Sequence, residues 1–371
     1  MFVPRFAEAG HNMAISCFYG LEGGCLEWNG IKCYPTDITR FGAMLLGEYA
    51  GHHAGGDRTA PLVMTLQDLW PLVQGLPNLQ GIRFACWTPV DHDPLPPMVG
   101  QFLRESGAQT IAMSQHGLGA LQQADFEALY VPHAVDTKAF RPRRDERDAL
   151  RTALKVPTDA FVVGMVANNQ GLPSRKCFPQ VFEAFAQLRK KHTDAVMYVH
   201  ADVHGRNGGV NLIQLASSCG IDPDSMRTSD QLALALGIPQ PVIAEIINCF
   251  DVLAMPSMGE GFGIPLIEAQ ACGVPVITTE WTAMTELCGA GWLVQGDKWW
   301  DQMQGAYQKV PYVADIAEAM DNAYNDAEGL SEQAVAFAAA YDVDRVMVEH
   351  WLPTLDLVLR PREVPALRIA A

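Results

Sequence analysis

Hydrophobic and polar positions alternate regularly through the second half of the chain. Short apolar runs rich in β-branched residues have the length of buried strands, at 161–167, 195–201, 251–257 and 274–280. The segments between them carry hydrophobic residues three and four positions apart, as amphipathic helices do, at 179–192, 211–220, 241–250 and 265–273. Because a parallel return between strands needs a crossover of a dozen or more residues, the alternation predicts one doubly wound α/β domain.

The first part of the chain has a less regular pattern of the same class. Its apolar runs of strand length are NMAISCFYG, LVMTLQD, IRFACWTPV, TIAMS and ALYVPH, separated by polar or Gly/Pro-rich stretches. We expect residues 1–142 to form a Rossmann-like parallel-sheet domain and residues 143–343 to form a second one, with the basic stretch 140–148 as the linker. The amphipathic pattern within 344–371 predicts a helix and tail that could fold back across the linker onto the first domain.

The composition is that of a soluble globular protein, with 49% hydrophobic and 18% charged residues. No apolar run reaches the ~18 residues of a membrane helix and the N-terminus lacks a signal-peptide pattern, so we expect a cytoplasmic protein with no transmembrane segment. The net charge of −16 argues against a nucleic-acid partner, which would require a basic surface. The nine cysteines contain no CxxC pair, which predicts no metal site of that kind and fits a reducing compartment.

The most informative stretch is PSMGEGFGIPLIEAQACGVPVI, at 256–277. A predicted strand ends there, a glycine-rich loop follows, and a helix begins near Pro265. Glycines let the backbone approach a ligand closely, and a helix start leaves unpaired N–H groups with a partial positive charge. Since open α/β sheets bind ligands at the carboxyl ends of their strands, this stretch predicts a diphosphate site.

Two carboxylates bracket the loop, Glu260 within it and Glu268 one turn into the helix. Negative charge beside a phosphate is unfavourable, so we interpret the pair as acceptors of hydrogen bonds from sugar hydroxyls. The alternative is an ordinary joint between strand, turn and helix.

GEGFGIPLIEAQACGVPVI resembles the signature of retaining glycosyltransferases with the GT-B fold, specifically glycosyltransferase family 4 (glycosyl transferases group 1). The resemblance covers nearly the whole chain and implies an α/β fold of two Rossmann-like doubly wound domains that face a cleft. It implies that Glu260 contacts the donor sugar near the reacting carbon and that Glu268 holds the ribose hydroxyls. The backbone between them would line the donor sugar and phosphates; it comprises Gly261, Phe262, Gly263, Ile264 and Pro265.

SRKCFPQVFEAF, at 174–185, is similar to the family's Arg-Lys-Gly segment that opens a helix. The resemblance makes Arg175 and Lys176 the cations that neutralise the diphosphate, and fixed cations would stabilise the charge of a departing nucleoside diphosphate. Many relatives carry an arginine after the preceding strand, where this chain has Asn168 and Asn169. A solvated Arg-Lys pair at a helix start remains the alternative.

A histidine follows a predicted first-domain strand in CWTPVDHDPLPP, at 86–97. By position, His92 matches the family histidine that lies close to the donor sugar. Its neighbours Asp91 and Asp93 favour the protonated form of the imidazole. In the alternative reading, Asp91 or Asp93 binds the acceptor instead. An exposed loop histidine is the alternative. We expect His133 to be structural and the loop GRNGG, at 205–209, to be a surface turn.

The family's opening strand and glycine-rich loop have no counterpart here, because RFAEAGHNMAIS corresponds to the following helix end and second strand. In the usual strand order the opening strand is central. Its loss would leave a gap of roughly 9–10 Å in the first sheet. We expect either that the start of the chain is assigned too late or that other strands rearrange to close the gap.

The expected reaction is transfer of a hexose from a nucleotide diphosphate sugar to an acceptor, with retained anomeric configuration. The acceptor class stays open among a sugar, glycolipid, glycan or small molecule, and neither a metal nor a cofactor is expected. The alternatives are a nucleotide-sugar epimerase, a phosphorylase, or a non-catalytic nucleotide-sugar-binding protein. Base contacts are expected from 226–231.

Overall fold

The computed structural model describes residues 1–39 and 41–360. These residues divide into two compact units. The first comprises Met1–Pro132, the short segment Asp301–Ala306 and the described residues from Val343 onward, and the second comprises His133–Trp300 and Tyr307–Asp342.

The second unit contains a six-stranded sheet in which all neighbouring strands are parallel. Its strands are β8 (Val162–Val166), β9 (Val196–His200), β10 (Met226–Thr228), β11 (Val252–Ala254), β12 (Val276–Thr279) and β13 (Gly291–Val294). The order β10-β9-β8-β11-β12-β13 reverses direction between β8 and β11. This is the doubly wound topology predicted from the alternation, and ligands bind such sheets at the reversal.

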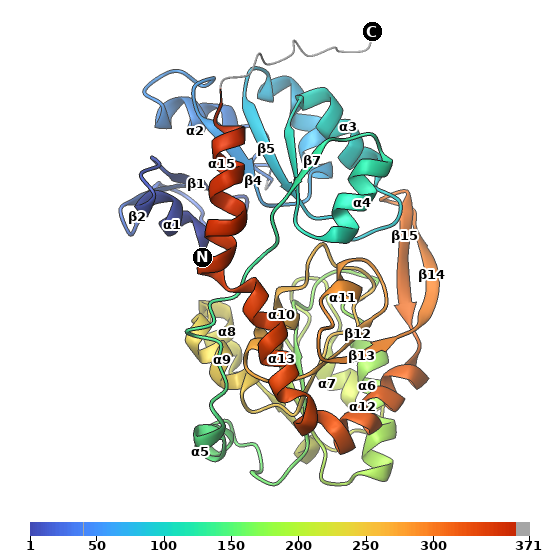
Figure 1. Ribbon diagram of the computed structural model, residues 1–371. Coiled ribbons are helices and arrows are strands. Elements are labelled where there is room, and N and C mark those ends of the chain that lie inside the picture. The colour runs from blue at the N-terminus through green and yellow to red at the C-terminus, as the bar shows by residue number, and fades with distance from the viewer. Residues whose placement is uncertain (40, 361–371) are drawn as a thin grey trace. The chain divides into compact units, whose positions relative to one another are not determined.

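Helices connect these strands and cover the sheet (Figure 1). They are α5 (Arg147–Ala153), α6 (Phe178–Lys191), α7 (Leu212–Ser218), α8 (Gln231–Leu236), α9 (Gln240–Ile247), α10 (Ile264–Ala271), α11 (Ala283–Glu286), α12 (Val313–Asp326) and α13 (Ser331–Ala338). Buried side chains of α6 and α12 share one core with β8, β9 and β11. The four helices predicted from periodicity correspond to α6, α7, α9 and α10, so the apolar pattern predicted this unit well.

A two-stranded ribbon, β14 (Gly296–Asp301) and β15 (Ala306–Pro311), follows β13 (Figure 1). It was not predicted from the sequence, although its aromatic residues Trp299, Trp300 and Tyr307 favour strands. The four residues between the strands make it a hairpin, and its tip belongs to the first unit.

The first unit contains a parallel four-stranded sheet in the order β4-β5-β6-β7. These strands are β4 (Leu62–Thr65), β5 (Arg83–Thr88), β6 (Gln109–Ala112) and β7 (Ala128–Tyr130). The core beside them includes buried side chains of α3 (Pro97–Ser106), α4 (Gln115–Gln123) and the 3₁₀ segment Trp70–Leu79. Leu46, at the start of α2 (Leu46–His53), joins the same core.

A second, separate sheet in this unit has the order β1-β3-β2, with β1 parallel and β2 antiparallel to β3. Its strands are β1 (Ala14–Ser16), β2 (Leu26–Trp28) and β3 (Ile31–Tyr34). β1 and β4 therefore lie in different sheets. The β2 and β3 strands were not predicted from the sequence. β2 and β3 form an antiparallel hairpin closed by Asn29 and Gly30, whose φ angles are 51° and 75°. An Asn-Gly pair suits such a turn because both positions need positive φ.

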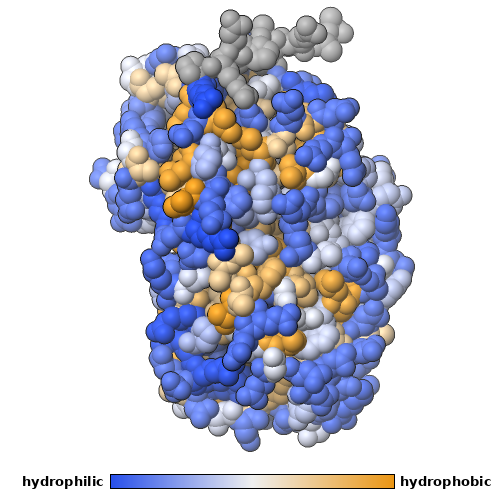
Figure 2. Space-filling model, viewed as in Figure 1, coloured by the Kyte–Doolittle hydropathy of each residue, from blue (hydrophilic) through white to orange (hydrophobic). Residues whose placement is uncertain are grey.

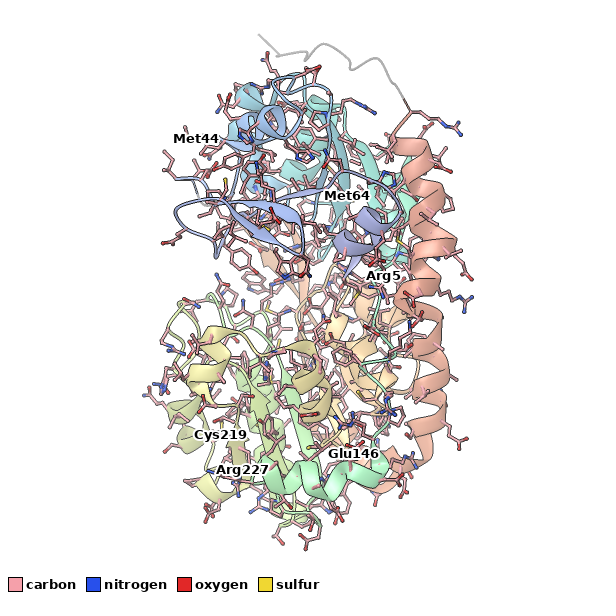
Figure 3. All side chains as sticks on the ribbon, turned by 90° about the vertical axis from the view of Figure 1, so that its left-hand side faces the viewer. Arg5, Met44, Met64, Glu146, Cys219 and Arg227 are labelled. Atoms are coloured by element: carbon pink, nitrogen blue, oxygen red, sulfur yellow. The ribbon has the colours of Figure 1, made fainter. Side chains whose placement is uncertain are left out.

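A nearly continuous helical segment ends the described chain: α14 (Val343–Val346), the π-turn Met347–Trp351 and α15 (Leu352–Val358). The ring of Trp351 lies 5.6 Å from that of Phe2 on α1 (Phe2–Glu8) and 4.8 Å from that of Trp87. Arg5 points toward this segment and donates a 3.0 Å hydrogen bond to Asp344 (Figure 3). These contacts hold the predicted C-terminal helix within the first unit.

None of the helices in the described residues is both long enough and apolar enough to cross a membrane. The face in Figure 2 is largely hydrophilic, with hydrophobic residues gathered in patches on both units.

Candidate active site

Backbone hydrogen bonds of Met258 attach the glycine-rich loop that follows β11 to two other segments. The N–H of Met258 donates to the carbonyl of Arg175 at 2.9 Å, and the N–H of Lys309 on β15 donates to the carbonyl of Met258 at 2.9 Å. The hydroxyl of Thr279, at the end of β12, donates to the carbonyl of Ser257 at 2.8 Å. The loop is thus held between the Arg175 segment and the hairpin.

Gly263 ends this loop and caps helix α10. Its φ of +106° is a conformation that side-chain-bearing residues rarely adopt. A Cβ atom there would also lie 3.2 Å from Leu266 and 3.3 Å from Met255. Of the predicted donor-lining residues, Gly261, Phe262 and Gly263 are buried, while Ile264 and Pro265 are partly exposed.

Glu260 lies in the loop with its carboxylate paired to the ammonium of Lys176. Its own N–H donates to the hydroxyl of Thr282 at 3.1 Å, and Arg175 donates to the neighbouring carbonyl of Gly259 at 2.9 Å. Burial alone would raise the pKa of Glu260, but the charges of Lys176 and Arg175 and the hydrogen bonds to its carboxylate outweigh burial and hold the pKa low. Glu260 is therefore ionised, although it is only 8% exposed.

Glu268, on α10, is in a different electrostatic state. It is 7% exposed, and burial is the one influence on the pKa of its carboxyl group, with no hydrogen bond or ion pair from the part of the chain that the structure describes. Burial raises its pKa to about 7. A buried carboxyl group without a partner is costly, which makes it a candidate for binding ligand hydroxyls.

Asn169 has a structural role. Its side-chain amide donates to the carbonyls of Asp202 and Val210, and its carbonyl oxygen accepts from the N–H of Val210. These bonds hold the loop at 205–209, which forms a turn. Asn169 is therefore committed to this loop, and Arg175 and Lys176 remain the cations nearest Glu260.

His92 lies in the first unit, in the loop after β5, and is buried, so the alternative of an exposed loop histidine is wrong. Its Nδ1 lies 2.7 Å from Asp91, and its Nε2 lies 3.3 Å from Asp301 at the tip of the hairpin. Burial would lower the pKa of His92, but hydrogen bonds and charges from the two carboxylates outweigh burial and raise it. His92 therefore favours the imidazolium form that its acidic neighbours predict.

His133 is partly buried in the second unit, with its ring centroid 5.4 Å from that of Phe262. Burial lowers its pKa to about 3. It stays neutral at physiological pH, as suits a structural residue.

Two polar residues of the second unit were not selected from the sequence, Thr282 beside Glu260 and Gln308 on β15. Thr282 accepts from the backbone of Glu260, and Gln308 is buried on β15 with neither side-chain amide atom hydrogen-bonded within the described residues. Their only sequence signal was position after a strand or within an aromatic-rich segment. In the described residues no three His, Cys, Asp or Glu side chains are arranged to hold a metal ion.

The chain resembles known glycosyltransferase structures along most of its length. Sucrose-phosphate synthase from Thermosynechococcus elongatus superposes with a TM-score of 0.75 at 16% identity, over 96% of this chain and 91% of that one. Anabaena HepE in complex with UDP-glucose gives a TM-score of 0.63 at 19% identity, and the superposition covers 85% of this chain and 82% of that one. The fold is therefore GT-B, with two Rossmann-like domains.

Residues 160–324 match the family model described as glycosyl transferases group 1. A D-inositol 3-phosphate glycosyltransferase of Segniliparus rotundus is 28% identical over 296 residues, which cover 73% of this chain and 60% of that protein. D-inositol 3-phosphate glycosyltransferase 1 of Catenulispora acidiphila is 30% identical over 263 residues, which cover 66% of this chain and 59% of that protein. The chain thus spans about three fifths of the length of the curated relatives it matches.

Proposed function

We propose that the protein transfers a hexose from a nucleotide diphosphate sugar to an acceptor hydroxyl, with retention of anomeric configuration. One observation carries the proposal: an ionised Glu260 paired with Lys176 and an unpartnered, buried Glu268 flank the same glycine loop. The family match over 160–324, which contains all of these residues, supports it.

Each element of the loop has a place in donor binding. The start of α10 directs N–H groups toward the diphosphate, and Gly261 to Pro265 line it. Glu268 accepts hydrogen bonds from the ribose hydroxyls, and Glu260 contacts the sugar near its anomeric carbon. HepE has been solved with UDP-glucose, so UDP-glucose is the first donor to test.

In the proposed reaction the bond from the anomeric carbon to the diphosphate oxygen breaks, and the acceptor oxygen bonds to the same face of that carbon. The acceptor proton passes to the departing diphosphate. Arg175 and Lys176 stabilise the charge that develops on it, so we propose that no metal or cofactor is required. Chelator treatment should then leave the turnover rate unchanged.

His92 enters the proposal as a charged group in the first unit. Both its ring nitrogens have carboxylate partners. Its part is to balance charge or to orient a hydroxyl, rather than to act as a general base. The acceptor is a sugar, glycolipid, glycan or small molecule; the curated relatives are named for D-inositol 3-phosphate, which is the first acceptor to try.

Incubating the protein with UDP-, GDP- and ADP-glucose, with and without acceptors, tests the proposal. Acceptor-dependent release of nucleoside diphosphate with a glycoside of unchanged anomeric configuration supports it. A free epimer of the donor would indicate an epimerase, and a sugar phosphate formed with inorganic phosphate would indicate a phosphorylase. Donor binding without turnover would indicate a non-catalytic binding protein.

A further inference from the structure

The β14–β15 hairpin carries a cluster of aromatic rings and ammonium groups beside the donor loop. The cluster, called here the cation–aromatic face, consists of Trp281, Lys298, Trp300, Tyr307 and Lys309. The ammonium of Lys298 lies 5.2 Å from the ring centroid of Trp281 and 5.6 Å from that of Tyr307. The ammonium of Lys309 lies 5.3 Å from the Trp281 ring, and the rings of Trp300 and Tyr307 are 4.9 Å apart.

Neither lysine forms an ion pair within the described residues, and the carboxylate of Glu280 accepts from the Gln295 side chain that Lys309 also contacts. Lys309 donates to the backbone carbonyl of Glu280 at 2.9 Å and to the side chain of Gln295 at 3.4 Å, and Lys298 contacts aromatic rings. The nearby carboxylate of Asp297 instead accepts from the hydroxyl of Tyr312 at 2.5 Å. Two ammonium groups without an ion pair in the described residues lie beside the Trp281 ring, and an anion between them would relieve their repulsion.

The same face offers apolar area to a ligand. Trp300 is 45% exposed and Tyr307 is 38% exposed. The indole N–H of Trp281 is buried without an acceptor among the residues described. Half-exposed aromatic rings with polar edges suit a sugar, whose C–H face stacks on a ring while its hydroxyls and charged groups find the polar atoms.

The face is linked to the donor loop through the backbone. Lys309 supplies a side chain to the face and its N–H to the carbonyl of Met258, two residues before Glu260. A ligand on this face is therefore held by the strand that braces the loop.

We propose that the cation–aromatic face binds the acceptor, and that the acceptor is a sugar or oligosaccharide carrying an anionic group, either a phosphate or a carboxylate. The proposal rests on the transferase function above and adds the chemical class of the second substrate. The anionic group lies between Lys298 and Lys309, and the sugar rings lie on Trp300 and Tyr307.

A membrane surface fits the face less well, although tryptophan and lysine also gather at bilayer interfaces. Asp301, Gln302 and Gln304 at the hairpin tip are polar, and among the tip residues Met303 is the large apolar side chain that is exposed. The net charge of −16 would also repel anionic lipid.

Tryptophan fluorescence titrations with three oligosaccharides of equal length test this proposal: an oligogalacturonate, a phosphorylated malto-oligosaccharide and a neutral malto-oligosaccharide. We expect at least one charged probe to bind about tenfold more tightly than the neutral one. The double variant Lys298→Ala/Lys309→Ala should lose this preference, and Trp300→Ala should weaken binding of every probe that binds. Comparing the two charged probes separates phosphate from carboxylate.

Lys190→Ala, an exposed lysine on α6, is the matched control and should behave as wild type. Melting temperatures of the variants identify any loss caused by unfolding. Equal binding of all three probes, unchanged binding in the double variant, or binding to phosphatidylglycerol vesicles but to no oligosaccharide would overturn the proposal. If wild type instead binds the charged probes but none of UDP-, GDP- and ADP-glucose, the proposed transferase function fails while the anionic-sugar site stands.

Discussion

The ammonium group of Lys176 forms an ion pair with the carboxylate of Glu260, a residue 84 positions further along the chain. Lys176 lies just before α6, where a cation is unfavourable beside the positive end of the helix. Glu260 offsets that cost, and Lys176 in turn keeps Glu260 ionised although it is buried. The pair joins the two segments that the donor diphosphate and sugar are proposed to contact.

Lys176→Ala should lower the free energy of unfolding, because it removes one of the two cations among the described residues that stabilise the buried carboxylate of Glu260 and leaves Arg175. A double-mutant cycle with Glu260→Gln, measured by urea unfolding, should give a coupling energy of about 1–3 kcal/mol. Lys190→Ala combined with Glu260→Gln is the control cycle and should give no coupling energy. A coupling energy near zero for Lys176 and Glu260 would show that the pair is not formed in solution.

Glu268 should make stability depend on pH in a defined direction. Its pKa is about 7 in the folded protein and 4.5 ordinarily, so between these values the folded state retains a proton that the unfolded state has lost. The free energy of unfolding should therefore fall as pH rises from 4.5 to 7, by roughly 3 kcal/mol from this residue. Glu268→Gln should abolish this part of the fall, whereas exposed Glu183→Gln should not. Parallel pH profiles for wild type and Glu268→Gln would contradict the assignment.

Donor binding should release a proton from Glu268, since ribose hydroxyls donate to the ionised form. Calorimetric titration with UDP-glucose near pH 6, in buffers of different ionisation enthalpy, measures that release. We expect net release in wild type and much less in Glu268→Gln. Proton uptake, or equal release by both proteins, would show that the carboxyl group does not bind the donor in this way.

Asp301→Asn should lower the pKa of His92, because it removes one of the two carboxylates that outweigh burial. NMR titration of the imidazole C–H signals measures the change, and Asp297→Asn on the same strand is the control, since Asp297 binds Tyr312. Because the folded pKa is raised, the stability gained from protonated His92 is complete below its ordinary value of 6.5 and is lost as pH rises through the folded value. An unchanged His92 pKa in Asp301→Asn would mean that the contact is absent in solution.

Gly291→Ala should destabilise the second unit by about 1–3 kcal/mol or more. Gly291 begins β13 with φ +143°, and a Cβ atom there would lie 1.9 Å from the carbonyl oxygen of Val276 on β12. Gly329→Ala is the matched control, since its Cβ would meet nothing within 4 Å. Urea denaturation of both variants checks this, and equal stability of the two would refute the packing account.

Sequence pattern predicted β8, β9, β11 and β12 and the helices between them well, because these four strands are fully buried and α6 buries one regular face. It failed where short-range chemistry decides the structure. The β2–β3 hairpin follows from Asn29 and Gly30, a signal present in the sequence and not used. The β14–β15 hairpin had only aromatic enrichment as a signal.

The residues of the candidate site also fall into two groups, those that a local sequence motif predicted and those that only the tertiary structure brings in. The motif residues Glu260 and Glu268 could be selected by their spacing around the glycines, whereas Thr282 joins the site through one hydrogen bond to the backbone of Glu260. The second partner of His92, Asp301, is 209 positions away and comes from the hairpin that was not predicted. Contacts of that range depend on tertiary structure and leave no local pattern.

Calorimetric titration with UDP-, GDP- and ADP-glucose tests the central claim most directly, using wild type, Glu268→Ala and Glu260→Ala. We predict that at least one of these donors binds wild type, that Glu268→Ala weakens its binding about tenfold or more, and that Glu260→Ala mainly slows donor turnover. Folded wild-type protein that binds none of the three donors, or variants that both keep wild-type affinity and turnover, would contradict the assignment of this loop as the donor site.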